Sequence, residues 1–151
     1  MTTDAPPTGG RLLVVDDNEM NRDLLSRRLQ QQGHTVSLAE NGRRALEMIA
    51  AEEFDLVLLD IMMPELDGYA VLERMRGDGT LDRLPVIMIS AVTEIESVVR
   101  CIEIGATDYL PKPFNTVLLR ARVGATLEKK RLRDQERLWA KSLERELEIG
   151  R

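Results

Sequence analysis

Short apolar segments alternate along the chain with amphipathic segments of helical length. The apolar segments at 56–59 and 86–89 contain no polar residue, which is typical of strands covered on both faces of a sheet. The segment at 35–39 is more polar, which predicts a strand at the edge of the sheet. The predicted strands lie at 12–15, 35–39, 56–59, 86–89 and 108–110.

Helical periodicity fills the intervals between these strands. Asn41 stands where its side chain can cap the second helix, and Gly33 and Gly105 stand just beyond the ends of two others. Strands that alternate with helices in this way predict an α/β fold, here a (βα)5 doubly wound parallel sheet. The periodicity does not give the order of the strands. The predicted helices lie at 19–32, 42–52, 66–77 and 94–104.

The C-terminal part of the chain predicts one long helix. Asn115 can cap it, and no proline follows. Apolar residues recur along one face, which predicts a homodimer through this helix; the alternative is that its first half packs on the sheet and the remainder frays. The face consists of Leu118, Ala121, Ala125, Glu128, Leu132, Gln135 and Trp139, continued by Leu143 and Leu147. We therefore expect a flexible leader at 1–10, a globular domain at 11–126 and a helical, coiled-coil linker at 127–151.

Composition and charge narrow the class of protein. Hydrophobic residues make up 43% and charged residues 31% of the 151 positions, so the chain can bury a core. Residues 1–120 carry 12 basic and 20 acidic side chains, and an acidic domain of this kind argues against nucleic-acid binding. No apolar segment approaches the length of a membrane helix. The single cysteine cannot form a disulfide within the chain. This agrees with a location in the reducing cytoplasm, which we expect for this protein.

Polar residues follow four of the predicted strands at the point where each strand ends. Asp16 and Asp17 follow the first strand, Asp60 the third, Ser90 the fourth and Lys112 the fifth. Because parallel strands end on the same side of a sheet, these side chains can converge in one cleft. Clustered carboxylates repel one another unless a cation is present, and their oxygen atoms suit Mg²⁺.

This cluster can carry phosphoryl chemistry. An ionised aspartate can attack phosphorus, and the charge of the resulting acyl phosphate can be offset by Mg²⁺ and Lys112. Taken singly, an aspartate after a strand is often a helix cap, as Asp17 or Asn18 could be for the first predicted helix. The combination of residues is more specific than any one of them.

The combined pattern resembles the receiver domain of two-component response regulators, the CheY-like superfamily. The matching stretches LLVVDDNEMNRDLL, DLVLLDIMMPELDGYAVLERMR, LPVIMISA and GATDYLPKPF span residues 12–114, essentially the whole globular part. The resemblance implies a flavodoxin-like fold with strand order 2-1-3-4-5. It also implies a domain that is controlled by phosphorylation and is not itself an enzyme.

By this resemblance Asp60 accepts a phosphoryl group from a sensor histidine kinase or a phosphotransfer protein. The carboxylates of Asp16, Asp17 and Asp60, with the backbone carbonyl of Met62, are the implied ligands of Mg²⁺. Met62 is apolar and stands two residues after Asp60, and Val92 stands two residues after Ser90. Because neither side chain can orient an attacking water, we expect a comparatively persistent phosphoryl group.

The resemblance assigns further roles around the acceptor. Lys112 and Ser90 contact the phosphoryl group, and Ser90 and Tyr109 form the switch that responds to it. Pro113 matches a position with a cis peptide bond in the family. The phosphorylated state would pass through the fifth helix to an output module.

The linker suggests what that output could be. The stretch LEKKRLRDQERLWAKSLERELEIGR resembles helices that precede PP2C-like phosphatases or nucleotide cyclases, so we expect the chain to be part of a longer protein with a covalently linked output domain. One alternative is a stand-alone phosphotransfer or protein-binding module. A second is an aspartyl-phosphate phosphohydrolase, a class that needs an acid where Met62 stands.

Overall fold

The computed structural model describes residues 9–91 and 94–149. Its centre is a five-stranded parallel sheet in the order β2-β1-β3-β4-β5. The most polar strand, β2, lies at an edge as predicted, and both the (βα)5 arrangement and the strand order implied by the family resemblance are confirmed. The strands are β1 (Arg11–Val15), β2 (Thr35–Ala39), β3 (Leu56–Leu59), β4 (Val86–Ser90) and β5 (Asp108–Pro111).

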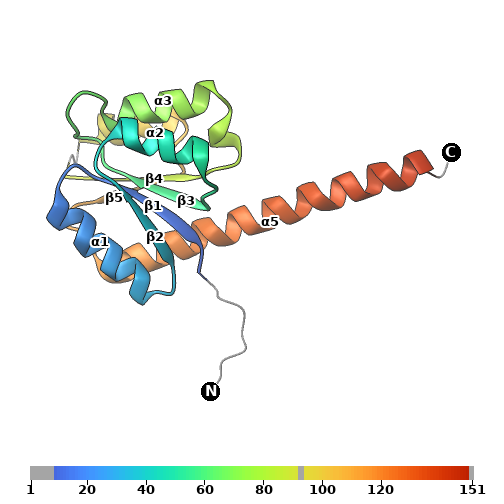
Figure 1. Ribbon diagram of the computed structural model, residues 1–151, viewed down its shortest axis with the longest axis horizontal. Coiled ribbons are helices and arrows are strands. Elements are labelled where there is room, and N and C mark those ends of the chain that lie inside the picture. The colour runs from blue at the N-terminus through green and yellow to red at the C-terminus, as the bar shows by residue number, and fades with distance from the viewer. Residues whose placement is uncertain (1–8, 92–93, 150–151) are drawn as a thin grey trace, which may run out of the picture.

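Helices cover both faces of the sheet, with α1 and α5 on one face and α2, α3 and α4 on the other (Figure 1). Successive residues of β1 point to opposite faces, so Leu12 packs with the α1 and α5 side and Leu13 with the other. All residues of β3 and β4 are buried. The helices are α1 (Glu19–Gln31), α2 (Gly42–Ala51), α3 (Gly68–Gly77), α4 (Ile95–Ile104) and α5 (Thr116–Ile149), with a short 3-10 helix, η1 (Thr80–Asp82), before β4.

Polar side chains begin most of these helices. Asn41 caps α2 as predicted, and Asn18, not Asp17, caps α1. Asn115 accepts hydrogen bonds from two backbone amides at the start of α5. Helix α3 begins at Gly68 and not at residue 66, because the Asp67 side chain accepts from the Ala70 amide and caps the helix there.

The fifth helix is much longer than the others. Its 34 residues span about 50 Å at 1.5 Å per residue, and its C-terminal part projects well beyond the sheet (Figure 1). Leu119 and Val123 are buried against the sheet. Farther along, the Arg137 guanidinium donates a hydrogen bond to the Asp82 carbonyl. Among the described residues, no helix is both long and apolar enough to cross a membrane.

The two ends of the chain are only partly described. Residues 1–8 of the predicted leader and 150–151 of the predicted linker lie outside the described residues. The end of the leader contacts the domain, because the Gly10 amide donates to Nδ1 of His34 at 3.0 Å. The domain boundaries proposed from the sequence stay predictions.

One glycine allows the start of α3 to pass close to the strand-end loop after β3. A Cβ atom at Gly68 would lie 2.4 Å from the Asp60 carbonyl oxygen and 2.7 Å from the Ile61 Cα. Both contacts are with backbone atoms, which cannot move aside as the end of a flexible side chain could. The Gly68 amide also donates to the Ile61 carbonyl at 2.9 Å. A side chain at this position would therefore push the loop away from the helix.

We predict that Gly68→Ala lowers the free energy of unfolding by about 1–3 kcal/mol, the usual cost of forcing extra atoms into a packed site. Gly124→Ala is the matched control, because no atom lies within 4 Å of a Cβ built there. Alanine is the better helix former, so this control should gain up to about 1 kcal/mol. Denaturant unfolding measures both, and equal effects of the two substitutions would contradict the packing argument.

Candidate functional site

The three predicted acids meet where β1 and β3 end. Asp16 directly follows β1, Asp60 directly follows β3, and the last residues of the two strands pair with each other. One carboxylate oxygen from each of Asp16, Asp17 and Asp60 lies within 4.8 Å of the others. Asp16 and Asp60 are only 3% and 6% exposed, whereas Asp17 is exposed. Three hard oxygen donors at the ends of two neighbouring strands fit a divalent cation such as Mg²⁺.

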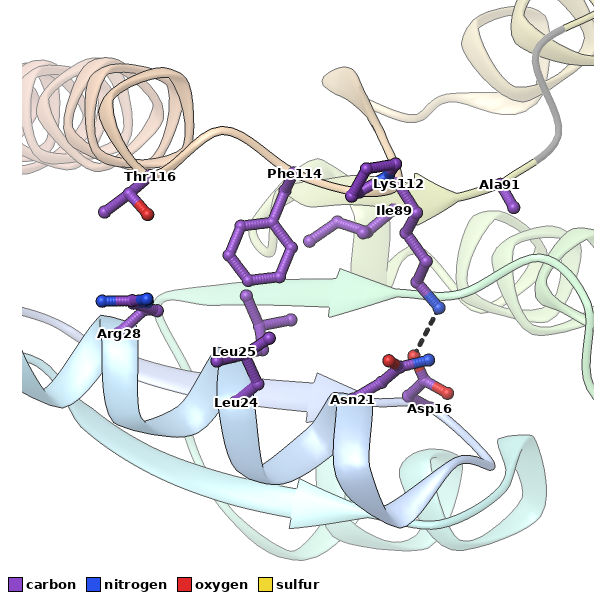
Figure 2. Close-up of a pocket in the computed structure, with 11 residues that line it drawn as sticks. Asp16, Asn21, Leu24, Leu25, Arg28, Ile89, Ala91, Lys112, Phe114 and Thr116 are labelled. Carbon is purple, nitrogen blue, oxygen red and sulfur yellow. Dashed lines mark hydrogen bonds and ion pairs between the residues drawn. The ribbon is translucent and has the colours of Figure 1, made fainter.

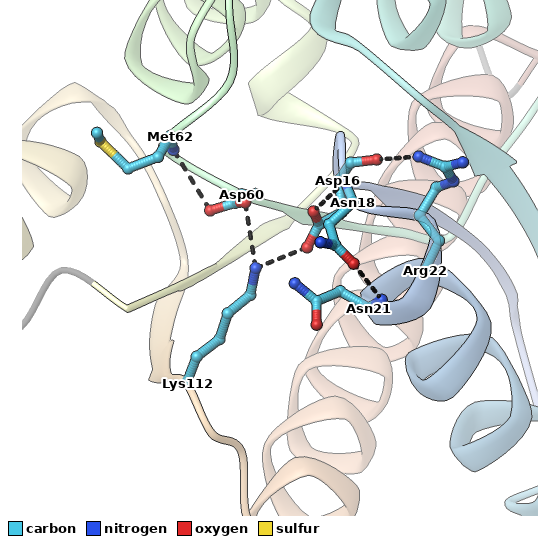
Figure 3. Close-up of polar contacts among 7 residues, drawn as sticks. All are labelled: Asp16, Asn18, Asn21, Arg22, Asp60, Met62 and Lys112. Carbon is cyan, nitrogen blue, oxygen red and sulfur yellow. Dashed lines mark hydrogen bonds and ion pairs between the residues drawn. The ribbon is translucent and has the colours of Figure 1, made fainter.

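The ammonium group of Lys112 lies between the two buried carboxylates (Figure 3). Its Nζ is 2.6 Å from Asp16 Oδ2 and 3.1 Å from Asp60 Oδ2. The Lys112 amide donates to the Ser90 carbonyl at 2.9 Å, which ties the residue to the end of β4. The Lys112–Pro113 peptide bond is cis. Residues from three strand ends are thus joined by one cation.

Burial and neighbouring charges shift the pKa values of Asp60 and Lys112. Burial raises the pKa of the Asp60 carboxyl above its usual value, and the nearby Asp16 charge adds to this, while Lys112 acts in the opposite direction. Burial alone would lower the pKa of Lys112, but its hydrogen bonds and charge interactions with Asp16 and Asp60 outweigh that effect and raise it. Lys112 therefore stays protonated, and an additional cation near Asp60 would favour its ionised, nucleophilic form.

Backbone groups fix the orientation of both buried acids. The second oxygen of Asp16 accepts from the Asn18 amide at 2.9 Å, and that of Asp60 accepts from the Met62 amide at 3.3 Å. The Arg22 guanidinium donates to the Asp16 carbonyl at 2.7 Å. The Met62 side chain is 65% exposed and points away from Asp60 (Figure 3).

The predicted switch residues lie on the neighbouring strands β4 and β5. Ser90 ends β4 and is fully buried. Tyr109 lies one strand farther out, paired with Met88, and packs against the core on the α2, α3 and α4 side. Burial raises the pKa of the Tyr109 hydroxyl, while a hydrogen bond with the Ser90 side chain acts in the opposite direction. The hydroxyl groups of Ser90 and Tyr109 therefore interact directly. Val92 lies outside the described residues.

Two contacts near the site were missed in the sequence. Arg22 contacts Asp16, and the Arg100 guanidinium of α4 lies 3.9 Å from the centre of the Tyr69 ring of α3, a cation–π contact. Both join residues of different elements or turns, and neither residue type nor spacing marks such a pair in a single sequence.

An apolar pocket opens beside the acidic cluster, between α1 and the loop that joins β5 to α5 (Figure 2). It encloses about 350 Å³. Leu24, Leu25 and Phe114 are among its apolar lining residues, and the Lys112–Asp16 ion pair lies at one end. A surface that binds here would reach the charged site directly.

Comparison with known proteins identifies the class that this fold and site define. The family described as response regulator receiver domain matches residues 12–124. Response regulator MprA of Mycobacterium ulcerans is 44% identical over 126 residues, which cover 83% of the chain and 53% of that protein. The Mycobacterium tuberculosis MprA is 43% identical over 124 residues, with coverage of 82% and 53%. The chain belongs to the response regulator receiver domain family.

Solved structures agree with this assignment. The receiver domain of the Francisella response regulator 1452 has a TM-score of 0.75 and 30% identity, and the match covers 80% of the chain and 98% of that domain. NtrX from Brucella abortus has a TM-score of 0.77 and 35% identity, with 84% of the chain and 29% of NtrX covered. The chain also spans about half the length of the curated relatives it matches. It is a receiver domain, a signalling module controlled by phosphorylation, and its acidic pocket consists of Asp16, Asp17 and Asp60.

We predict that Lys112→Met destabilises the domain by on the order of 3 kcal/mol when divalent cations are chelated, because two buried carboxylates lose their counter-charge. Lys130→Met is the control, since both lysine side chains are 19% exposed and Lys130 also pairs with two acids. Its partners are more exposed, so we expect a loss below about 1 kcal/mol. Denaturant unfolding in chelator measures both values. Equal losses would show that the Lys112 ion pairs do not hold the site together.

Proposed function

We propose that Asp60 accepts a phosphoryl group from the phosphohistidine of a sensor histidine kinase or a phosphotransfer protein, with Mg²⁺ as the metal. One observation carries the proposal: the buried Asp60 carboxylate lies within 4.8 Å of Asp16 and Asp17 and 3.1 Å from the Lys112 ammonium. Together these residues supply a nucleophile, ligands for a cation and a fixed positive charge at the place where the strands end. Phosphoryl transfer depends mainly on such positioning and charge.

The transfer itself exchanges one bond for another. An oxygen of Asp60 forms a bond to phosphorus while the phosphorus–nitrogen bond to the donor histidine breaks, and the imidazole nitrogen keeps the electron pair. When bound by Asp16, Asp17, Asp60 and the Met62 carbonyl, Mg²⁺ supplies positive charge to the carboxylate and phosphoryl oxygens.

The protein's own groups stabilise the product. The Lys112 ammonium offsets the added negative charge, which is why its position between Asp16 and Asp60 matters. Ser90 is proposed to donate its hydroxyl to a phosphoryl oxygen. The apolar pocket formed by Leu24, Leu25 and Phe114 gives a protein donor a surface to bind next to the acceptor.

We further propose that the state of Asp60 is relayed to an output module. Movement of Ser90 toward a phosphoryl group would disturb its hydrogen bond with Tyr109, and both residues lie on strands that pair beside α5. Helix α5 begins at Thr116, four residues after Lys112, and extends away from the domain. A preference of a few kcal/mol between two arrangements would suffice. The curated relatives are about twice as long as the matched region, which supports a linked output domain. A PP2C-like phosphatase or a cyclase is proposed from the resemblance of the linker helix alone.

Two other readings have less support. A phosphohydrolase needs an acid two residues after its nucleophile, where this chain has Met62 with its side chain turned outward. A stand-alone phosphotransfer module would give the long exposed half of α5 no output domain to reach. We place the chain in the cytoplasm, with no contact to nucleic acid by this segment, in agreement with its net charge of −5 and its single cysteine.

Incubation with acetyl phosphate tests the acceptor. Wild-type protein with Mg²⁺ should gain the mass of one phosphoryl group, and Asp60→Asn should gain none because an amide cannot act as the nucleophile. Chelation of the metal should also prevent the gain. Mass spectrometry of the intact protein is the measurement. An unmodified wild type, or equal modification of both proteins, would refute the proposal.

The phosphoryl group should persist, because the apolar side chain of Met62, two residues after Asp60, cannot hydrogen-bond to an attacking water. We predict that Met62→Gln, which places an amide near the acceptor, shortens the lifetime of the phosphoryl group several-fold. Met20→Gln is the control, since Met20 is equally apolar, exposed and outside the acidic pocket. The loss of phosphoryl mass after removal of the donor gives the lifetimes. If Met62→Gln and Met20→Gln decay at the same rate, position 62 does not control hydrolysis.

A further inference from the structure

Helix α5 has two faces of different character. The face toward the sheet contains the buried residues Leu119, Val123 and Thr126. At about 100° per residue, a second set of residues lies on nearly the opposite side of the helix and is exposed along its whole length. We call this set the outer stripe, and it consists of Ala121, Ala125, Glu128, Leu132, Gln135 and Trp139.

The outer stripe leaves large apolar side chains in water. Leu132 and Trp139 are 47% and 70% exposed, and Leu138, Leu143 and Leu147, in the same C-terminal part of α5, are also exposed. Such a patch on a monomer marks a contact surface. A projecting helix also gains little stability from its own hydrogen bonds, so apolar packing must hold it.

We propose that a second copy of the chain covers the outer stripe in a parallel, in-register two-stranded coiled coil. The stripe has the 3-4 spacing that such a contact requires, with Ala125, Leu132 and Trp139 in one row and Ala121, Glu128 and Gln135 in the other. Because the stripe faces away from the sheet, the two domains lie on the outer sides of the pair and do not collide. The polar residues Glu128 and Gln135 limit its affinity.

The residues beside the stripe select the parallel orientation. In a parallel pair, Arg131 lies next to Glu136 of the partner subunit, and Leu138 lies next to Leu143 of the partner subunit. The first contact joins opposite charges, and the second extends the apolar surface. An antiparallel pairing of the outer stripe, in which Ala121 meets Trp139, would instead place Arg131 beside Arg131 of the partner subunit, a contact between like charges. It would also place Leu138 beside Gly124 of the partner subunit, so that the apolar contact with Leu143 would be lost.

Sedimentation of the 151-residue chain, without phosphodonor, measures the dimer. Leu132→Glu and Trp139→Glu should each weaken it roughly 100-fold or more, because each substitution removes a buried side chain from both copies. Ala140→Glu adds the same charge beside the stripe and should change the dissociation constant by less than about tenfold. A chain that stays monomeric, or a dimer that all three variants leave intact, would overturn the proposal.

Disulfide formation tests the orientation separately. In the Cys101→Ala background, Gln135→Cys should cross-link to its own counterpart, because equivalent stripe positions face each other only in a parallel pair in register. Glu144→Cys lies on the far side of the helix and should not cross-link. Equal cross-linking of both, or of neither, contradicts the parallel stripe. The test uses unphosphorylated protein, so its failure leaves the proposed phosphotransfer unaffected, and the reverse also holds.

Discussion

The architecture of the site depends on one positive charge that is placed between two buried negative ones. Lys112 partly offsets the charges of Asp16 and Asp60, at 2.6 and 3.1 Å. Without it, two desolvated carboxylates would repel each other at the ends of β1 and β3. The sheet provides the geometry for this contact, because β1, β3 and β5 all end on the same side. Three carboxylates face this single ammonium group, so the site remains short of positive charge and is suited to a divalent cation.

The same connection links the site to the long helix. Lys112 lies directly after β5, its amide is held by the Ser90 carbonyl, and α5 starts at Thr116. A change in the charge near Lys112 therefore acts on the two strands that carry Ser90 and Tyr109 and on the segment that begins α5. The sheet-facing side of α5 holds the helix on the domain, whereas the exposed outer stripe is the surface that we propose a second copy of the chain covers.

Much of this arrangement could be predicted from the sequence because it is local or repeats along the chain. Apolar runs located the strands, the polar run at 35–39 marked an edge, and parallel strands imply that Asp16 and Asp60 meet. The strand order came from family resemblance, since periodicity carries no information about which strands are neighbours. The start of α3 was misplaced because Glu65 adopts a left-handed conformation, with φ of 66°, and Asp67 caps the helix after it. Contacts between elements, such as Arg100 with Tyr69, depend on the packed fold and leave no pattern.

Chemical trapping of the acyl phosphate tests the central claim most directly. Borohydride reduces an aspartyl phosphate to homoserine, so protein treated with acetyl phosphate and Mg²⁺, reduced and digested carries a permanent mark at the acceptor. Peptide mass spectrometry should find homoserine at position 60, and Asp16 and Asp17 should be unchanged. Homoserine at either of those two positions in place of 60, or no homoserine in fully phosphorylated protein, would contradict the account.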